Sequence, residues 1–196
     1  ITMDFLFSSV QLHYAINHTF LIDENNALWA WGVYCRGAQK LEKDYPTPTK
    51  IMENVVSVSV SDKSVAVIKE DGSLWTWGLG TVGRPSEYPF TDEWVPKKLM
   101  DHVIYAKLYG NGGVAITEDH TLWRWPADSR VNSYRPEPAA IMEDVAKVAV
   151  SEYGGVTCAL KQDGTVWTSG DNRNGSLGNG SLEYGTYEWT KIPEDV

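Results

Sequence analysis

The chain repeats one short pattern four times, and this repeat constrains the fold more than any other feature of the sequence. The clearest copy is Lys69–Gly78, which reads Lys-Glu-Asp-Gly-Ser-Leu-Trp-Thr-Trp-Gly. The other copies are Asp23–Gly32, Thr117–Pro126 and Lys161–Gly170. Their first tryptophans are separated by 46, 48 and 44 residues, and they are Trp29, Trp75, Trp123 and Trp167. Repeats of this length are typical of propellers and solenoids.

Each copy predicts a β-hairpin with a two-residue turn. In the second copy, an apolar run precedes Asp71-Gly72, and the run Leu74–Trp77 follows it. Such turns require positive φ angles, which glycine adopts readily and which asparagine and histidine tolerate. Asn26 and His120 stand at the matching position of other copies, so we interpret His120 as a turn residue rather than a catalytic one. The paired tryptophans are two residues apart, so both should face one side of the strand and the preceding leucine the other.

Two further segments accompany each hairpin. An alternating apolar segment, typical of a strand, precedes it: Val10–Tyr14, Val56–Val60, Ile104–Leu108 and Ala146–Val150. A short Ile-Met signature lies upstream of that segment: Lys50–Val55, Lys98–Val103, Ala140–Val145 and, in modified form, Lys191–Val196, with Phe5–Ser8 in the same register at the start. We call the alternating strand A, the hairpin strands B and C, and the short strand D.

These units predict an all-β protein, a β-propeller of four-stranded antiparallel blades with four repeat units. We expect a single propeller-type domain over residues 1–196. Its repeats should cover about 5–50, 51–97, 98–139 and 140–190, with the start of a further unit at 191–196. Antiparallel order places the A–B and C–D connections at one edge of each blade, and the B–C turns with the D–A links at the other.

The variable connections are the predicted binding region, because function is often carried by loops on a rigid scaffold. Tyrosine and tryptophan are enriched in them, and these side chains dominate many protein interfaces. The candidate partner contacts are Tyr34, Tyr88, Phe90, Trp94, Tyr109, Tyr134, Tyr153, Tyr184, Tyr187 and Trp189.

Composition and motifs narrow the function classes. The net charge of −9 opposes binding to a phosphate backbone, so we expect no nucleic-acid partner. No apolar run has the length of a membrane span, so we expect no membrane insertion. Asp171–Gly175 is a poor calcium loop because Arg173 stands where an oxygen ligand is needed. We find no zinc spacing, nucleophile elbow or nucleotide-binding loop, and therefore predict no catalytic residue, metal or cofactor.

The hairpins, together with Gly170–Gly180 in the fourth unit, resemble the repeat of the regulator of chromosome condensation family. That repeat runs Asp-Gly-x-Val/Leu-Trp-x-Trp-Gly-x-Asn-x-x-Gly-Gln-Leu-Gly-x-Gly. The resemblance covers all four units, although the first three have lost most of the glycine segment and Pro126 replaces its first glycine in the third. It implies seven blades in a complete member, so four units would form a partial ring.

The family includes nuclear exchange factors for a small GTPase and secreted bacterial proteins that inhibit β-lactamases. Our first hypothesis is a non-enzymatic scaffold that binds a protein partner through the A–B and C–D connections. The alternatives are a carbohydrate-binding module that uses the same aromatic residues, and, by family analogy, a regulator of a small GTPase. We expect a secreted or cell-surface bacterial protein rather than a cytoplasmic one. We expect either an open arc that self-associates, because uncovered blade ends favour pairing with another chain, or a fragment of a propeller with further blades.

Overall fold

The computed structural model describes residues 10–15, 18–32, 45–61, 64–78, 96–110, 112–125, 137–151, 155–182 and 188–193. These residues form four antiparallel sheets of four strands each, and every sheet keeps its strands in chain order. The described part of the chain contains no helix, and so no helix that could span a membrane. The predicted all-β fold with four-stranded blades is confirmed. The end segments Phe5–Ser8 and Glu194–Val196 lie outside the described residues.

Strands A, B, C and D of each blade follow one another along the chain. Blade 1 has β1 (Gln11–Ala15), β2 (His18–Ile22), β3 (Leu28–Gly32) and β4 (Tyr45–Met52). Blade 2 has β5 (Val55–Ser61), β6 (Ser64–Lys69), β7 (Leu74–Gly78) and β8 (Lys97–Met100). Blade 3 has β9 (Val103–Tyr109), β10 (Gly112–Thr117), β11 (Leu122–Trp125) and β12 (Ala139–Met142). Blade 4 has β13 (Val145–Val150), β14 (Val156–Lys161), β15 (Val166–Gly170) and β16 (Thr190–Lys191).

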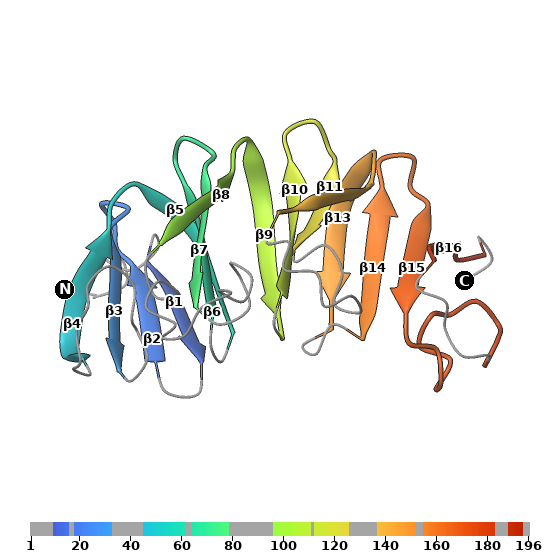
Figure 1. The fold of residues 1–196 in the computed structure, drawn as a ribbon, viewed down its shortest axis with the longest axis horizontal. Coiled ribbons are helices and arrows are strands. Elements are labelled where there is room, and N and C mark those ends of the chain that lie inside the picture. The colour runs from blue at the N-terminus through green and yellow to red at the C-terminus, as the bar shows by residue number, and fades with distance from the viewer. Residues whose placement is uncertain are drawn as a thin grey trace, which may run out of the picture.

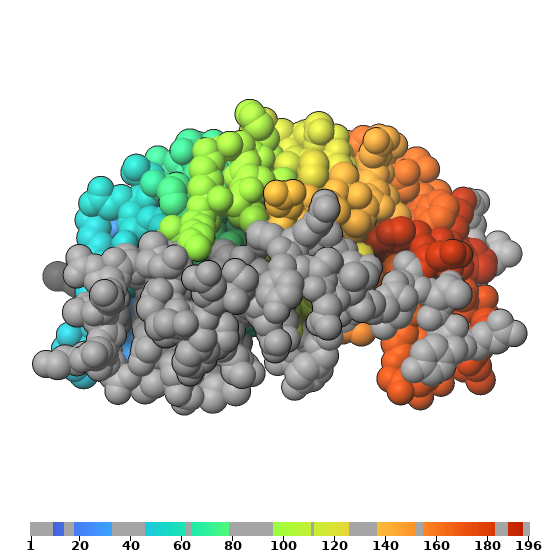
Figure 2. Space-filling model, viewed as in Figure 1, coloured from blue at the N-terminus to red at the C-terminus, as the bar shows by residue number. Residues whose placement is uncertain are grey.

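The four blades lie in a row, with blades 1 and 4 at its opposite ends (Figure 1). The edge that carries the B–C turns and D–A links is called the turn edge here, and the edge at which the A–B and C–D connections begin is called the loop edge. Figure 2 shows the turn edge as a surface that runs across all four blades. The chain thus forms an open arc of a propeller.

The hairpin turns have the predicted backbone. Asn26, Gly72, His120 and Gly164 occupy matching places, with φ angles of 58°, 75°, 64° and 85°. The turn aspartate accepts hydrogen bonds from the residue two positions later: Asp163 Oδ1 lies 2.9 Å from Thr165 N and 2.6 Å from Thr165 Oγ1. The Thr165 hydroxyl then accepts a hydrogen bond from Trp167 Nε1 at 3.0 Å, which joins the turn of this blade to its first tryptophan. The two hydrogen bonds to Asp163 hold its pKa below the ordinary value, and the bond from the Thr165 hydroxyl has the larger effect.

Blades pack through three apolar clusters, one at each junction, and the predicted strand faces account for them. Trp77 packs toward blade 1 in the first cluster, whereas Leu74 packs toward blade 3 in the second. Trp123 and Trp125 both join the second cluster, while Leu122 joins the third, between blades 3 and 4. Tryptophans two residues apart therefore share a face, and the leucine before them faces the next blade.

Backbone hydrogen bonds at the turn edge join each blade to the next. At each junction, the amide of the valine that begins strand A donates to a carbonyl in the turn of the preceding blade. The pairs are Val55 with Asn26 at 2.8 Å, Val103 with Gly72 at 2.9 Å and Val145 with His120 at 2.8 Å. The residue before each valine is also left-handed, with φ of 60°: Asn54, His102 and Asp144. Their carbonyls accept from Glu70, Glu118 and Gln162 in their own blade's turn, each at 2.8 Å. The same clasp thus recurs at all three junctions.

Candidate functional site

Most of the predicted partner contacts fall in connections at the loop edge. The residues that lie outside the described part of the structure are Tyr34, Tyr88, Phe90, Trp94, Tyr134, Tyr153, Tyr184 and Tyr187. The structure describes the other two, Tyr109 and Trp189, and brings them to one cluster.

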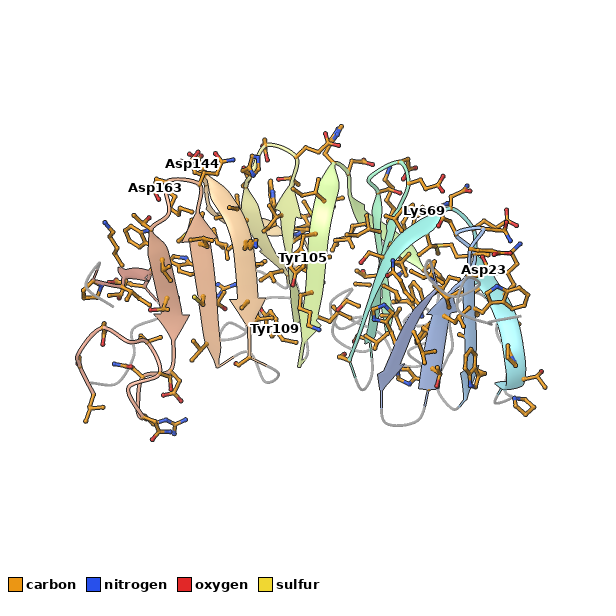
Figure 3. The ribbon with its side chains drawn as sticks, turned by 180° about the vertical axis from the view of Figure 1, so that it is seen from behind. Asp23, Lys69, Tyr105, Tyr109, Asp144 and Asp163 are labelled. Atoms are coloured by element: carbon orange, nitrogen blue, oxygen red, sulfur yellow. The ribbon has the colours of Figure 1, made fainter. Side chains whose placement is uncertain are left out.

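Tyr109 ends β9, and Figure 3 shows it at the loop-edge end of that strand. Tyr109 and Trp189 are both half-buried and pack against the third apolar cluster. Burial raises the pKa of the Tyr109 hydroxyl, and the positive charge of Arg124 offsets part of that effect. Both rings therefore contribute to the junction between blades 3 and 4, and each offers part of its surface to solvent.

The glycine segment of blade 4 is the best described part of the loop edge, and Asn172 organises it. This side chain is 1% exposed. Its Nδ2 donates to the Ser181 carbonyl at 2.9 Å and to Asn179 Oδ1 at 3.3 Å, while its Oδ1 accepts from Leu177 N at 3.0 Å. One buried amide thus ties together both arms of the loop.

Leu177 fastens this loop to the blade. Its side chain is 2% exposed, and its carbonyl accepts a hydrogen bond from Thr168 Oγ1 of β15 at 2.7 Å. Gly175, Gly178 and Gly180 have φ angles of 71°, 63° and 76°, so three left-handed turns bring the chain back on itself. The Asn-x-x-Gly-x-Leu-Gly pattern is therefore a folded loop held on strand C.

The acidic residue at the start of this loop is already paired. The Arg173 guanidinium donates to both carboxylate oxygens of Asp171, from Nε at 3.0 and 2.8 Å and also from Nη2. The Arg173 side chain is the main reason why the pKa of Asp171 lies below its ordinary value. No group of three or more metal-ligating side chains was found among the described residues.

Sequence reasoning missed one apolar residue of this loop. Leu182 is 75% exposed, the most exposed of the large apolar side chains that the structure describes. A Cβ added to Gly175 would lie 3.2 Å from Leu182 Cδ2, so the side chain lies over the glycine turn. The search for aromatic residues could not find it, although a lone leucine between Ser181 and Glu183 in a glycine-rich segment is a visible signal. Leu182 joins Tyr109 as a described candidate contact at the loop edge.

Strand A contributes a second group that the sequence left unassigned. Val56, Ile104 and Tyr105 are 41%, 54% and 39% exposed, and they lie in the A strands of blades 2 and 3. Neighbouring A strands are linked directly, because Leu108 N donates to Ser59 Oγ at 2.9 Å. The alternation of these segments predicted the first strand of each blade, but it did not predict the hydrogen bond between the A strands of neighbouring blades.

Replacing Asn172 by alanine should loosen the glycine loop. The variant leaves the buried Leu177 amide without its acceptor, and one such loss costs about 1–3 kcal/mol of stability. Urea denaturation followed by tryptophan fluorescence measures the change. Asn174 is exposed in the same loop, so Asn174→Ala serves as the control and should stay within about 0.5 kcal/mol of the wild type. Equal stabilities of the two variants would contradict the assigned role of Asn172.

The fold resembles several solved β-propeller structures. Human WBSCR16 matches with a TM-score of 0.69 and 20% identity, over 93% of this chain and 52% of that one. Prp20p from Saccharomyces cerevisiae matches with a TM-score of 0.72 and 18% identity, over 95% of this chain and 51% of that one. Yeast RCC1 (Prp20), solved with Kap60, matches with a TM-score of 0.71 and 17% identity, over 95% of this chain and 50% of that one.

These likenesses define the class of fold, a β-propeller with blades of the regulator of chromosome condensation type, as the repeat predicted. The chain spans about half the length of the solved structures that it matches. A scan against models of protein families and a search of curated proteins found no match.

Proposed function

We propose that this chain is a non-enzymatic scaffold that binds a protein partner through its loop edge. The observation that carries the proposal is the division between the two edges of the arc. The turn edge is held by the same pair of backbone hydrogen bonds at all three junctions. These hydrogen bonds hold neighbouring blades together, so the strand ends of all four blades lie side by side at the opposite edge (Figure 1). Connections that differ between repeats extend a binding surface from there.

Chemistry at the described part of that edge supports the same proposal. The glycine loop is held by a buried amide, so Leu182 is presented on a structured loop at little entropic cost to a complex. Exposed apolar or aromatic residues with polar residues around them are typical of protein interfaces. Among the solved structures, Prp20p is described with its binding to Gsp1p and histones, and yeast RCC1 is seen bound to Kap60.

The test compares two surfaces of one protein by affinity capture. The loop-edge variant carries Tyr88→Ala, Trp94→Ala and Leu182→Ala. The control variant carries Glu24→Ala, Glu143→Ala and Gln162→Ala, three exposed positions at the turn edge. Each immobilised protein is incubated with the same extract, and quantitative mass spectrometry compares what is retained.

We expect at least one protein to be retained equally by the wild type and the control and to fall about tenfold on the loop-edge variant, which corresponds to about 1.4 kcal/mol of binding energy. The opposite result would contradict the proposal: if proteins are retained equally by the wild type and the loop-edge variant but lost on the turn-edge control, the partner binds at the turn edge.

A further inference from the structure

The A strands of neighbouring blades lie next to each other and form one surface, which is called the inner wall here. Gln11 Nε2 of β1 donates to the Val56 carbonyl of β5 at 3.4 Å, and Leu108 N of β9 donates to Ser59 Oγ of β5 at 2.9 Å. The blades of a propeller are arranged around a central channel, and the strands at which neighbouring sheets meet are the ones that face it. The inner wall therefore faces the axis of the propeller, and this holds for any number of blades.

The inner wall is basic in a protein that is acidic as a whole. The chain has a net charge of −9, yet the sequences of β1, β5, β9 and β13 contain no aspartate or glutamate. They contain Lys107 and Lys147, and both side chains are exposed. At the turn edge, Lys50 and Lys98 each pair with a carboxylate three residues further on, at 2.6 and 2.7 Å. Lys107 and Lys147 form no ion pair with any residue that the structure describes.

Three side chains that can donate hydrogen bonds stand at one level of the inner wall. His13, Ser59 and Lys107 occupy the same phase of the repeat in blades 1, 2 and 3. The His13 side chain is half-buried, and burial together with the positive charge of Lys107 lowers its pKa. The ammonium group of Lys107 therefore lies within electrostatic range of the imidazole, although blade 2 stands between their two blades.

Ser59 lies between these two residues and has a hydrogen to donate. Its side chain is 7% exposed, and its oxygen already accepts the hydrogen bond from Leu108 N. A serine hydroxyl also carries one hydrogen of its own. Within the described ranges, that hydrogen has no acceptor. The middle of this level is therefore a buried donor without an acceptor.

Tyr105 borders the same level on the side of the turn edge. It is two residues from Lys107 in β9, so the two side chains point to the same side of the strand. Figure 3 shows Tyr105 on β9, nearer the turn edge than Tyr109. Burial raises the pKa of the Tyr105 hydroxyl, which therefore keeps its hydrogen as a further donor.

We propose that the inner wall binds a small tetrahedral oxyanion such as phosphate between blades 1 and 3, held by His13, Ser59 and Lys107. Such a ligand supplies the two things that these residues lack, an acceptor for the Ser59 hydroxyl and a counter-charge for Lys107. Charge-assisted hydrogen bonds of this kind are stronger than those between neutral groups. Phosphate and sulfate offer four acceptor oxygens and a carboxylate offers two, so donors from three blades fit the tetrahedral ions better. This site is independent of the partner surface proposed at the loop edge.

The test is isothermal titration calorimetry of the full chain with sodium phosphate, in which sodium chloride keeps the ionic strength constant. The wild type should bind a single phosphate per chain. Lys107→Gln removes the charge of an exposed lysine and should weaken binding at least about tenfold. Lys97→Gln is the matched control: it removes the same charge from an exposed lysine of strand D, and it should bind phosphate like the wild type.

Three further ligands test the chemical class of the anion. Sodium sulfate should compete with phosphate, and sodium acetate at the same concentration should not. Acetate that competes as well as sulfate would contradict the tetrahedral assignment. Glycerol phosphate identifies the source of the group: binding equal to that of phosphate assigns the site to a phosphate carried by a larger molecule, and binding of phosphate alone assigns it to the free ion.

Nuclear magnetic resonance of the histidine rings locates the site at constant pH. Phosphate should shift the ring signals of His13, which are identified by their loss in His13→Gln. The signals of His102, an exposed histidine at the turn edge, should stay in place. A wild type that does not bind phosphate overturns the proposal. Equal weakening by Lys107→Gln and Lys97→Gln, or equal shifts at His13 and His102, would show non-specific attraction and overturn it too.

Discussion

Replacing Trp125 by alanine is expected to cost about 3–5 kcal/mol, the usual range for removing a large aromatic side chain from a packed core. Trp125 is 0% exposed and belongs to the cluster that joins blades 2 and 3. Its partner across the strands is Gly113, and the two residues are directly opposite in register. A Cβ added to Gly113 would lie 2.3 Å from Trp125 Cζ2, so the indole occupies the space that a side chain at position 113 would need.

This contact makes the two residues interdependent. Gly113→Ala alone should cost about 1–3 kcal/mol through overpacking. In a Trp125→Leu background the same change should cost much less, because the smaller side chain leaves room for the new methyl group. Urea denaturation of the four proteins in this cycle gives the coupling energy, which should exceed about 0.5 kcal/mol for residues in contact.

Blade 4 offers a matched control for the cycle. Thr157 occupies the place of Gly113, and Ser169 stands opposite it where blade 3 has tryptophan. Thr157→Ala should therefore change stability by less than about 1 kcal/mol. Strict additivity of the Gly113 and Trp125 substitutions would contradict the predicted clash.

The second large effect is expected at Gly170, where backbone rather than a side chain fills the space. Gly170 has a φ of 131°, and an added Cβ would lie 2.0 Å from the Gly155 carbonyl oxygen. The same oxygen accepts a hydrogen bond from Asp171 N at 2.6 Å. A backbone carbonyl cannot move aside as the end of a flexible side chain can, so Gly170→Ala should cost more than about 3 kcal/mol.

Gly180 provides the comparison for Gly170. It also has a positive φ, of 76°, but an added Cβ would meet no atom within 4 Å in the part of the chain that the structure describes. Gly180→Ala should therefore cost only the left-handed backbone penalty of about 1–2 kcal/mol. Thermal unfolding of both variants measures the difference. Similar midpoints would show that the backbone at Gly155 relaxes around the new methyl group.

The repeat predicted the local structure well because its signals act over a few residues. Asp-Gly and its replacements select the turn, and the spacing of Trp75, Trp77 and Leu74 selects the two faces of the strand. Strand D was predicted less well. β4 extends over Tyr45–Met52, and it tolerates Pro46 and Pro48 because the last strand of a sheet leaves one side of its backbone unpaired within that sheet.

The candidate site was predicted in outline and not in detail. The repeat indicated which connections gather at one edge, and the structure holds the strand ends in that arrangement. It did not indicate that Tyr109 and Trp189 pack against an apolar cluster, or that Leu182 is exposed on a loop held by Asn172. These properties depend on contacts between residues of different strands or loops, for which the spacing of residues along one strand contains no signal.

By itself, the sequence determined the hairpins, the strand faces and the propeller class, because side-chain alternation and turn conformation follow from neighbouring residues. The tertiary structure decided which apolar residues become core. Leu12 and Val58 stand at the same phase of the repeat, yet one is 62% exposed and the other 3%. The difference arises because burial is a property of what packs against a strand, and a blade packs against Val58 but not against Leu12.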